Sequence, residues 1–581
     1  MKFMRKLVLL LPVFFVSVSL HAAEAWIGES NRHTQPVLEL LGRYNPEFAS
    51  MFGLEQYDTE VIDLGPRRHE RFQADLGRAL RDVEAALASA KHPKVRQDLE
   101  ILAKALRDER ESARLNHELM LPFYNVGEIA FQGLRLLMDE RNTEERRARA
   151  VERLKRYAGM APGSTPLAEL ARARTAERLA VPNLTGPYVE QVRKAIANTE
   201  VFLGGLEQMF RSANLSGWEE AHGRLGEQLR DYAKWLEQDL MKHARRDNRL
   251  PEAIYADNLR NYGVEMDPRE LIRRATFGFA EIRDEMQAVA RQIAKERGFP
   301  SDDYRDVIRE LKKDQVQGEA ILPLYKDTLK ALEEMIVKHD IVTLPAREAG
   351  IRLSTEAEAA ASPAPHMNPP RLIGNTGEYG EFVLPLRNPN ADPGALMDDF
   401  THKAYAWSLT AHESRPGHEL QFAAMVERGV SLARAIFAFN SANVEGWGLY
   451  AEAIMKEYMP LEGQLCTLQN RLLRAARAFI DPMLNLGLMK PEEAKRILME
   501  EVVLSDPFAT QEVDRYTYRA PGQATSYYYG YMNLRAMRIE AELALRDRFS
   551  EKAFHDFVLA QGLLPPAQLR KAIMEEFVAA R

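Results

Sequence analysis

The segment HESRPGH at residues 412–418 combines the residue types that hold zinc and activate water in many hydrolases. In the standard form of this motif the two histidines are four residues apart, so that both project from one face of a helix onto one metal ion. His412 and His418 are six residues apart, and an undistorted helix would turn their side chains roughly 120° away from each other. Pro416 cannot donate a backbone N–H and Gly417 tolerates unusual dihedral angles. We therefore predict a shared metal site on the condition that the backbone is deformed at Pro416 and Gly417.

A second segment, NVEGWGLYAE at residues 443–452, supplies carboxylates on what is predicted to be a neighbouring helix. Glu445 is suited to be the third ligand, and three protein ligands leave one coordination position for water. Glu452 lies seven residues further on, nearly on the same helix face, and could orient the ring of a ligand histidine. Taken singly, helical histidines usually pack in a core and paired glutamates usually face solvent, so the combination carries the prediction.

Glu413 follows the first histidine directly, as the catalytic glutamate does in the standard motif. Zinc lowers the pKa of its bound water to about 7, and a neighbouring carboxylate can then take the proton as the water attacks a carbonyl. The chain contains neither a G-x-S-x-G nucleophile elbow nor a glycine-rich phosphate loop. Cys466 lies in the helical stretch LEGQLCTLQN and is expected to be a small packed residue rather than a nucleophile.

The elements that must position these residues are predicted to be helices. From about residue 67 to residue 338, apolar residues recur at intervals of three and four between charged ones, and prolines mark the junctions. Helical character returns after residue 393 and continues to the C-terminus. Long helices with short proline-containing joints indicate a bundle-like arrangement. The predicted class is mostly α, a large helical fold with one small β element.

The β element is expected between about residues 341 and 393, where proline and glycine become frequent. The runs RLIGN (371–375) and EFVLPL (381–386) are typical of strands around a turn, although an irregular loop would also fit. Pro385 would restrict the second run to a sheet edge. Such an edge could bind an extended peptide as an added strand beside the metal.

The N-terminus has the pattern of a secretory signal peptide over residues 1–23. A charged segment at residues 2–6 precedes an apolar run at residues 7–20 and small residues ending near Ala23. No cysteine follows the apolar run, so we expect no lipid attachment there, and the predicted location is the periplasm or the exterior. The single cysteine of the chain excludes an internal disulfide framework.

Charge and hydropathy exclude several classes of partner. The formal net charge is −7 and no dense basic run is present, which argues against nucleic acid and anionic membranes. No later apolar run reaches spanning length, so no stable membrane anchor is expected. The oligomeric state is left open.

Three segments resemble the hallmarks of the DUF885 family: HESRPGHELQ, EGWGLYAE and RAPGQATSY. The family pattern is HExxPGHxxQ, EGWxLYAE and PGQAxSY, and the tail FHDFVLAQGLLPPAQLRKAI is similar to the family's C-terminal end. The resemblance is strong over about residues 365–575 and weak over the N-terminal helices. It implies a zincin-like, largely helical metallopeptidase with a cleft, similar in plan to oligopeptidases and carboxypeptidases, whose substrates are mostly unassigned.

By motif position, the resemblance implies that His412, His418 and Glu445 are zinc ligands and that Glu413 is the general base. Tyr527 occupies the tyrosine position of PGQAxSY and is our candidate donor to the developing oxyanion.

The chain departs from the family at Tyr528, where the pattern has a lysine, which puts any substrate contact of that lysine in doubt. For Tyr528, Tyr529 and Tyr531 aromatic packing is the simpler interpretation. Candidates for bidentate binding of a substrate carboxylate are Arg519, Arg535 and Arg538.

Together these features predict a zinc-dependent peptidase that hydrolyses short peptides, of oligopeptidase, dipeptidase or carboxypeptidase type. We expect residues 24–340 to form an N-terminal helical region and residues 341–581 the catalytic region, packed as one compact unit. A non-catalytic peptide-binding relative and a zinc hydrolase of non-peptide amides are the alternatives. Glu413 favours an enzyme over a binding protein, because binding alone needs no base beside a ligand.

Overall fold

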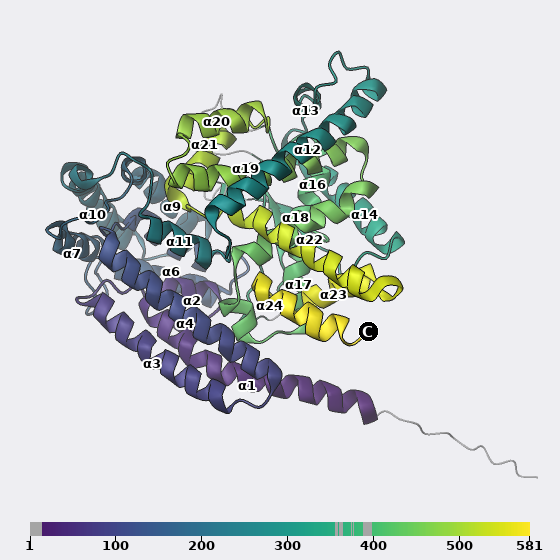
Figure 1. Cartoon of the computed structure of the whole chain (residues 1–581). Coiled ribbons are helices and arrows are strands. Elements are labelled where there is room, and N and C mark those ends of the chain that lie inside the picture. Colours follow the sequence, from purple (N-terminus) through teal and green to yellow (C-terminus); the bar gives the residue numbers. More distant parts are fainter. Residues whose placement is uncertain (1–13, 355–357, 360–363, 374, 376, 387–397) are drawn as a thin grey trace, which may run out of the picture.

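The computed structural model describes residues 14–354, 358–359, 364–373, 375, 377–386 and 398–581. Within these ranges the chain is mostly helical and contains one small sheet (Figure 1), which confirms the predicted class. Helix α1 (Phe14–Tyr44) runs through the expected cleavage zone near Ala23. Residues 1–13 of the expected signal peptide lie outside the described residues, and the signal peptide stays a prediction. Across the described ranges, no helix has both the length and the apolar character that crossing a membrane requires.

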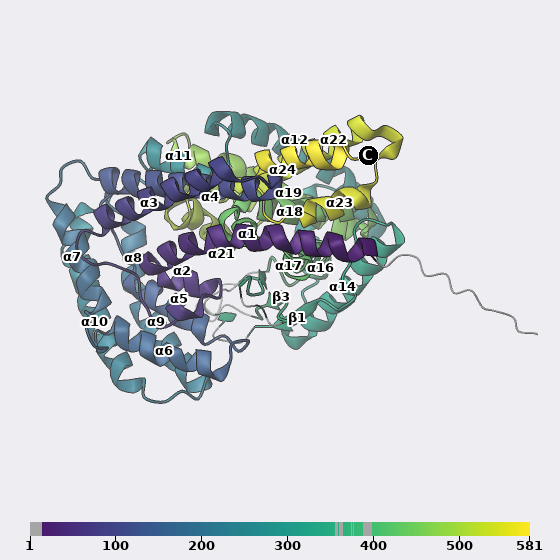
Figure 2. The same ribbon diagram turned by 90° about the horizontal axis from the view of Figure 1, so that it is seen from below.

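The first ten helices form one side of the molecule, and apolar residues at helical spacing explain their packing. Leu206, Leu225 and Phe210 are fully buried in a core that α5 to α10 share, and α1, α3 and α4 pack around a second core. Figure 2 shows α5 to α10 grouped together, with α1 running past them towards the other helices. The helices after α1 are α2 (Pro46–Met51), α3 (Arg68–Ser89), α4 (Pro93–Leu119), α5 (Val126–Leu137), α6 (Glu144–Tyr157), α7 (Leu167–Leu179), α8 (Val189–Ala197), α9 (Thr199–Ser212) and α10 (Glu219–Gln238).

The remaining helices surround a larger core, in which α12, α19 and α22 are the longest elements (Figure 1). Helices α12 and α14 share this core with the helices that follow residue 400, and the division into regions at residue 340 stays a prediction. The helices are α11 (Glu252–Asn261), α12 (Pro268–Arg297), α13 (Tyr304–Leu311), α14 (Ile321–Lys338), α16 (Lys403–Glu413), α17 (His418–Arg428), α18 (Ser441–Met455), α19 (Leu461–Asn485), α20 (Pro491–Glu500), α21 (Asp506–Asp514), α22 (Thr525–Leu545), α23 (Glu551–Ala560) and α24 (Pro566–Ala572).

Shorter helical turns join these elements. The π-helical turns are η4 (Ala433–Phe437), η6 (Arg515–Arg519) and η8 (Ile573–Val578). The 3-10 turns are η1 (Glu55–Tyr57), η2 (Leu240–His243), η3 (Gly318–Ala320), η5 (Lys456–Tyr458) and η7 (Arg546–Arg548). Turns of π type occur often at functional sites, and η6 lies directly before the PGQATSY segment.

The sheet has three strands in the order β1-β3-β2. Strand β1 (Gly350–Leu353) pairs in parallel with β3 (Glu381–Leu384), and β2 (His366–Asn368) pairs antiparallel with β3. The strand prediction at residue 381 is therefore confirmed, but the prediction of a strand at 371–375 is wrong for residues 371–373 and 375; residue 374 lies outside the described residues. Pro369 and Pro370 end β2 because they have no N–H to donate. The side chain of Asn375 then accepts hydrogen bonds from the backbone of Gly377 and Glu378, which holds this stretch as a loop.

The prediction that residues 381–386 form a sheet edge is also wrong. Strand β3 is central, with β1 on one side and β2 on the other. Pro385 follows the last residue of the strand, so its missing N–H removes no bond from the ladder. A peptide cannot add to β3, because both of its sides are already paired.

Candidate metal centre

The HESRPGH segment contains a complete break between two helices rather than one bent helix. Helix α16 ends at Glu413 and α17 begins at His418. Residue 417 must be glycine, because a Cβ there would lie 1.8 Å from the carbonyl oxygen of His412. The indole N–H of Trp447 donates to the carbonyl of Pro416 at 2.9 Å, so the EGW segment also supports the turn. The turn between the two helices therefore sets where His418 points.

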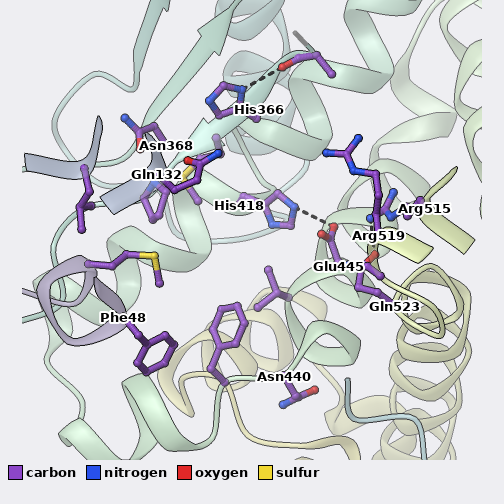
Figure 3. Close-up of a pocket in the computed structure, with 18 of the residues that line it drawn as sticks. Phe48, Gln132, His366, Asn368, His418, Asn440, Glu445, Arg515, Arg519 and Gln523 are labelled. Atoms are coloured by element: carbon purple, nitrogen blue, oxygen red, sulfur yellow. Dashed lines mark hydrogen bonds and ion pairs between the residues drawn. The ribbon is translucent and has the colours of Figure 1, made fainter. Parts of the chain in front are cut away.

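The three predicted ligands come together at one point. The Nε2 atoms of His412 and His418 lie 3.5 and 3.4 Å from Oε2 of Glu445. One potential ligand atom from each residue lies within 4.8 Å of the others. Figure 3 shows His418 and Glu445 pointing toward each other, with a dashed line between them. Glu445 and Glu452 both lie on α18, so one helix supplies both carboxylates.

Glu452 fixes the orientation of the first histidine. Its Oε1 lies 2.7 Å from Nδ1 of His412, and its other oxygen accepts a hydrogen bond from the hydroxyl of Ser408. This contact places the proton of a neutral imidazole on Nδ1 and leaves Nε2 free to bind a cation. Gly448 provides the space, since a Cβ at this position would lie 2.6 Å from Cε1 of His412.

Buried charges at the centre compensate one another. Burial lowers the pKa of His412, but the hydrogen bonds with Glu445 and Glu452 outweigh it and raise this pKa to about 9. Burial raises the pKa of Glu445, but hydrogen bonds from the two histidines hold it well below its usual range. Nδ1 of His418 is buried and has no hydrogen-bond partner among the described residues. The donor set is thus two imidazoles and one carboxylate, a combination that zinc accepts.

Glu413 and Tyr527 both reach this centre. Oε2 of Glu413 accepts a hydrogen bond from the backbone N–H of Met367 at 2.8 Å, so strand β2 orients the carboxylate. Tyr527 stacks against His412 with 6.5 Å between ring centroids. Its hydroxyl oxygen accepts a hydrogen bond from Nη2 of Arg515 at 3.1 Å. Burial raises the pKa of Tyr527, and the charge of Arg515 opposes this rise, so the phenol keeps its proton near neutral pH.

The other tyrosines of the SYYYGY run do not line the cavity. The hydroxyl of Tyr528 lies against Gly278 of α12, where a Cβ would approach it to 1.9 Å. Tyr531 accepts a hydrogen bond from Arg471 at 3.3 Å. Both side chains therefore pack between helices.

The three candidate carboxylate-binding arginines have different positions. Arg519 lines the cavity beside Glu445 (Figure 3). Arg538 points elsewhere and pairs with Glu542 and Glu551 at 2.6 and 2.7 Å. Arg535 is exposed on α22 and is not part of the cavity lining.

Sequence reasoning missed three further arginines that line the cavity: Arg474 and Arg477 on α19, and Arg515 on η6. A signal for two of them exists, because NRLLRAAR places arginine at every third residue of an otherwise apolar helix. The contact of Met367 with Glu413 has no sequence signal, since it uses a backbone N–H.

The metal centre opens into a cavity of about 2260 Å³. This exceeds the 300–1,000 Å³ that is usual for a small-molecule site, so several peptide residues can enter. Helices from both sides of the molecule contribute to its wall. The cavity wall also has exposed apolar side chains, with Phe48, Met51 and Phe439 exposed by 43, 50 and 47 %.

Comparisons with known proteins find one family model and solved structures with the same fold. No curated protein matches the chain. A solved structure of a "putative lipoprotein" from Colwellia psychrerythraea has a TM-score of 0.76 at 19% identity, covering 95% of this chain and 99% of that one. A "putative lipoprotein of unknown function" from Shewanella oneidensis has a TM-score of 0.72 at 18% identity, covering 94% and 99%. At these identities the likeness shows the shared fold.

The sequence model of the family described as "Bacterial protein of unknown function (DUF885)" matches residues 46–573. This span contains the metal centre, the sheet and nearly all of the helices. The chain therefore belongs to the DUF885 family.

Proposed function

We propose that this protein is a zinc-dependent peptidase that hydrolyses short peptides. The observation that carries the proposal is the meeting of two imidazole Nε2 atoms with the carboxylate of Glu445, 3.4 and 3.5 Å away. Glu413 lies directly beside this centre, and the cavity of about 2260 Å³ has room for a peptide but not for a folded protein.

The residues present fit a zinc ion. His412, His418 and Glu445 supply the two nitrogen atoms and one oxygen atom found in many catalytic zinc sites, and three protein ligands leave a position open. When bound there, zinc would supply an acidified water and polarise the carbonyl of the substrate. The contact between His412 and Glu452 would strengthen the nitrogen ligand and hold its ring in place.

Glu413 has the role of general base. The Met367 N–H holds one of its oxygens, so the other is free to accept a proton from the attacking water. The same carboxyl group can then deliver this proton to the leaving amine, which completes hydrolysis without another acid.

Tyr527 has the role of oxyanion donor. Because Arg515 donates to the phenolic oxygen, the phenol's own proton is available to a group in the cavity. A preorganised donor of this kind stabilises the charge that develops on the carbonyl oxygen.

Export is part of the proposal. The signal-peptide pattern at residues 1–23 supports it, and so does the description of two proteins with this fold as lipoproteins. N-terminal sequencing of protein recovered from outside the cytoplasm should begin near residue 24. A chain that retains Met1 and stays in the cytoplasm would contradict export.

The test is metal analysis together with digestion of a peptide mixture, for wild type and Glu413→Gln. We expect about one zinc per chain in both proteins. Cleavage by the variant should be lower by about 10²- to 10⁴-fold, the usual contribution of a general base. Glu427→Gln, on the surface end of α17, is the matched control and should cleave normally.

The outcomes separate the alternatives. Equal cleavage by wild type and Glu413→Gln would remove Glu413 from the mechanism. Purification of wild-type protein without bound metal would contradict the proposed zinc site. Zinc-loaded protein that cleaves amides but no peptide would identify a hydrolase of non-peptide amides, and peptide binding without any turnover would identify a binding protein.

A further inference from the structure

One wall of the cavity carries a group of arginines next to the metal centre. We call Arg474, Arg515 and Arg519 the arginine wall; all three line the cavity. In Figure 3, Arg515 and Arg519 lie on the same side of the cavity as Glu445, and Phe48 lies on the opposite side. Two of them come from the π-turn η6 and the third from α19, so separate elements place cations at one location.

The carboxylates near the wall are already occupied by other cations or donors. Both oxygens of Glu512 are bound by Arg477, at 2.7 and 2.8 Å. Asp514 forms an ion pair with Lys194 of α8. Glu452 is hydrogen-bonded to His412 and Ser408, and Nη2 of Arg474 lies 3.7 Å from its Oε1.

Two arginines of the wall keep unused donors. Arg515 is more engaged, because its Nη2 donates to Gln523 and Tyr527. Its Nη1 lies 3.4 Å from Glu512, but its side chain is still 23% exposed. Nε of Arg474 is buried and has no hydrogen-bond partner in the described part of the chain. Arg519 is exposed to the cavity, and the described residues provide it with no ion-pair partner. The wall therefore has surplus positive charge directed at the cavity.

The contact between Arg515 and Tyr527 links the arginine wall to the metal centre. Arg515 donates to the hydroxyl of Tyr527 at 3.1 Å, and the ring of Tyr527 stacks on His412. An anion on the wall is thus separated from the metal centre by one aromatic side chain. A group bound there would be close enough to belong to the same substrate whose amide is at the metal.

We propose that the arginine wall binds a carboxylate of the peptide substrate. This inference rests on the proposed peptidase function and gives its substrate class. Guanidinium groups match carboxylates with paired N–H donors. The carboxylate at the C-terminus of a short peptide is one source and an acidic side chain is the other. A terminal carboxylate held one side chain from the metal would direct cleavage to the bonds nearest the C-terminus.

The experiment compares three pools of N-acetylated hexapeptides with randomised sequences that lack aspartate and glutamate. The first pool has a free C-terminal acid, the second a C-terminal amide, and the third an amide with glutamate as its last residue. Retention of each pool on immobilised Glu413→Gln protein measures binding without turnover. Mass spectrometry of wild-type digests gives the cleavage positions.

We expect the free-acid pool to be bound about ten- to a hundredfold better than the amide pool, as for one hydrogen-bonded charge pair. In the Glu413→Gln background, Arg519→Ala should remove most of this preference and Arg519→Lys should restore part of it. Arg535→Ala, an exposed arginine outside the cavity, should leave it unchanged. Stronger retention of the third pool than of the second would show that a side-chain carboxylate is also accepted.

Equal retention of all three pools would overturn the proposal, as would retention of none. An acid preference that persists in both Arg519→Ala and Arg515→Lys would place the carboxylate elsewhere and overturn it too. Failure here is distinguishable from failure of the peptidase. Cleavage that depends on Glu413 but not on a substrate carboxylate would contradict only the proposed role of the arginine wall. Carboxylate-dependent binding without cleavage by wild type would contradict only the proposed peptidase activity.

Discussion

The two sides of the cavity use buried charge in opposite ways. On the N-terminal side, Arg146 of α6 is buried and its guanidinium is fully engaged by Asp58, Asn142 and the Ser50 carbonyl. On the metal side, Arg519 lines the cavity and has no ion-pair partner among the described residues, although Glu445 and Arg515 contact neighbouring side chains. A buried polar network whose members are all hydrogen-bonded contributes to a specific structure. A polar group that lacks a partner within the protein can instead bind a ligand.

Tight packing occurs on both sides of the cavity, but only at some positions. A Cβ added at Gly204 on α9 would meet no atom within 4 Å, whereas one at Gly448 on α18 would collide with the ring of His412 and one at Gly133 on α5 would lie 2.3 Å from the Tyr157 hydroxyl. Position 204 therefore tolerates an added side chain that positions 448 and 133 do not. Stability and chemistry should respond separately to substitutions on the two sides.

The largest effect is expected in the N-terminal core. Leu206→Ala removes a fully buried side chain of α9 and should lower the free energy of unfolding by about 2–5 kcal/mol. Urea unfolding followed by circular dichroism measures this loss. Zinc content of the folded variant should equal that of wild type, and a parallel loss of metal would show that the two sides are not separable.

The next effect concerns the orientation of His412. Glu452→Ala removes its 2.7 Å contact with Nδ1 and should weaken zinc binding by about 10- to 100-fold. Competition with a chromogenic chelator gives the affinity. Glu457→Ala, on the exposed turn after the same helix, is the control and should bind zinc as wild type does; an equal loss in both variants would argue against a role for Glu452.

A further effect depends on pH. Burial raises the pKa of Asp481 to about 7, although hydrogen bonds from Tyr255 and the Gly522 N–H oppose it. This pKa is higher than the unfolded value of about 3.9. The stabilisation that protonated Asp481 contributes is therefore complete below about pH 3.9 and is lost as pH rises through about 7. The stability of wild type relative to Asp481→Asn should fall over this window, by at most about 1.4 kcal/mol per pH unit.

This comparison must be made as a difference between the two proteins. Burial lowers the pKa of His402 and of His555 to about 4. The stability that these neutral histidines contribute is therefore lost as pH falls below about 6.5, which is opposite to the direction for Asp481. Both proteins share these histidines, and subtraction removes them. Unfolding midpoints at several pH values supply the data, and a difference that does not vary with pH would contradict the raised pKa.

The smallest effect is a gain. Gly204→Ala in the exposed part of α9 should stabilise the protein by about 0.5–1 kcal/mol, because alanine loses less backbone entropy in a helix. Thermal unfolding is sufficient to detect it. A decrease in stability would mean that position 204 has no room for the added methyl group.

Much of the candidate centre was predictable because its residues lie in short motifs. His412, Glu413 and His418 share seven residues, and Glu445 and Glu452 are seven apart on one helix. Helical periodicity also predicted the mostly α class. The strand at residue 381 was predictable from its apolar run, but its central position was not, because the pairing partners β1 and β2 are set by the surrounding chain.

Local sequence thus determined which residue types and which helices could form a metal centre. Only the tertiary structure decided that the HESRPGH segment breaks into two helices and that the Met367 N–H holds Glu413. It also decided that Arg515 and Arg519 of η6 meet Arg474 of α19 in one wall. The physical reason is that periodicity reports contacts within one element, whereas a metal centre and a charged wall need groups from several elements held together by the core.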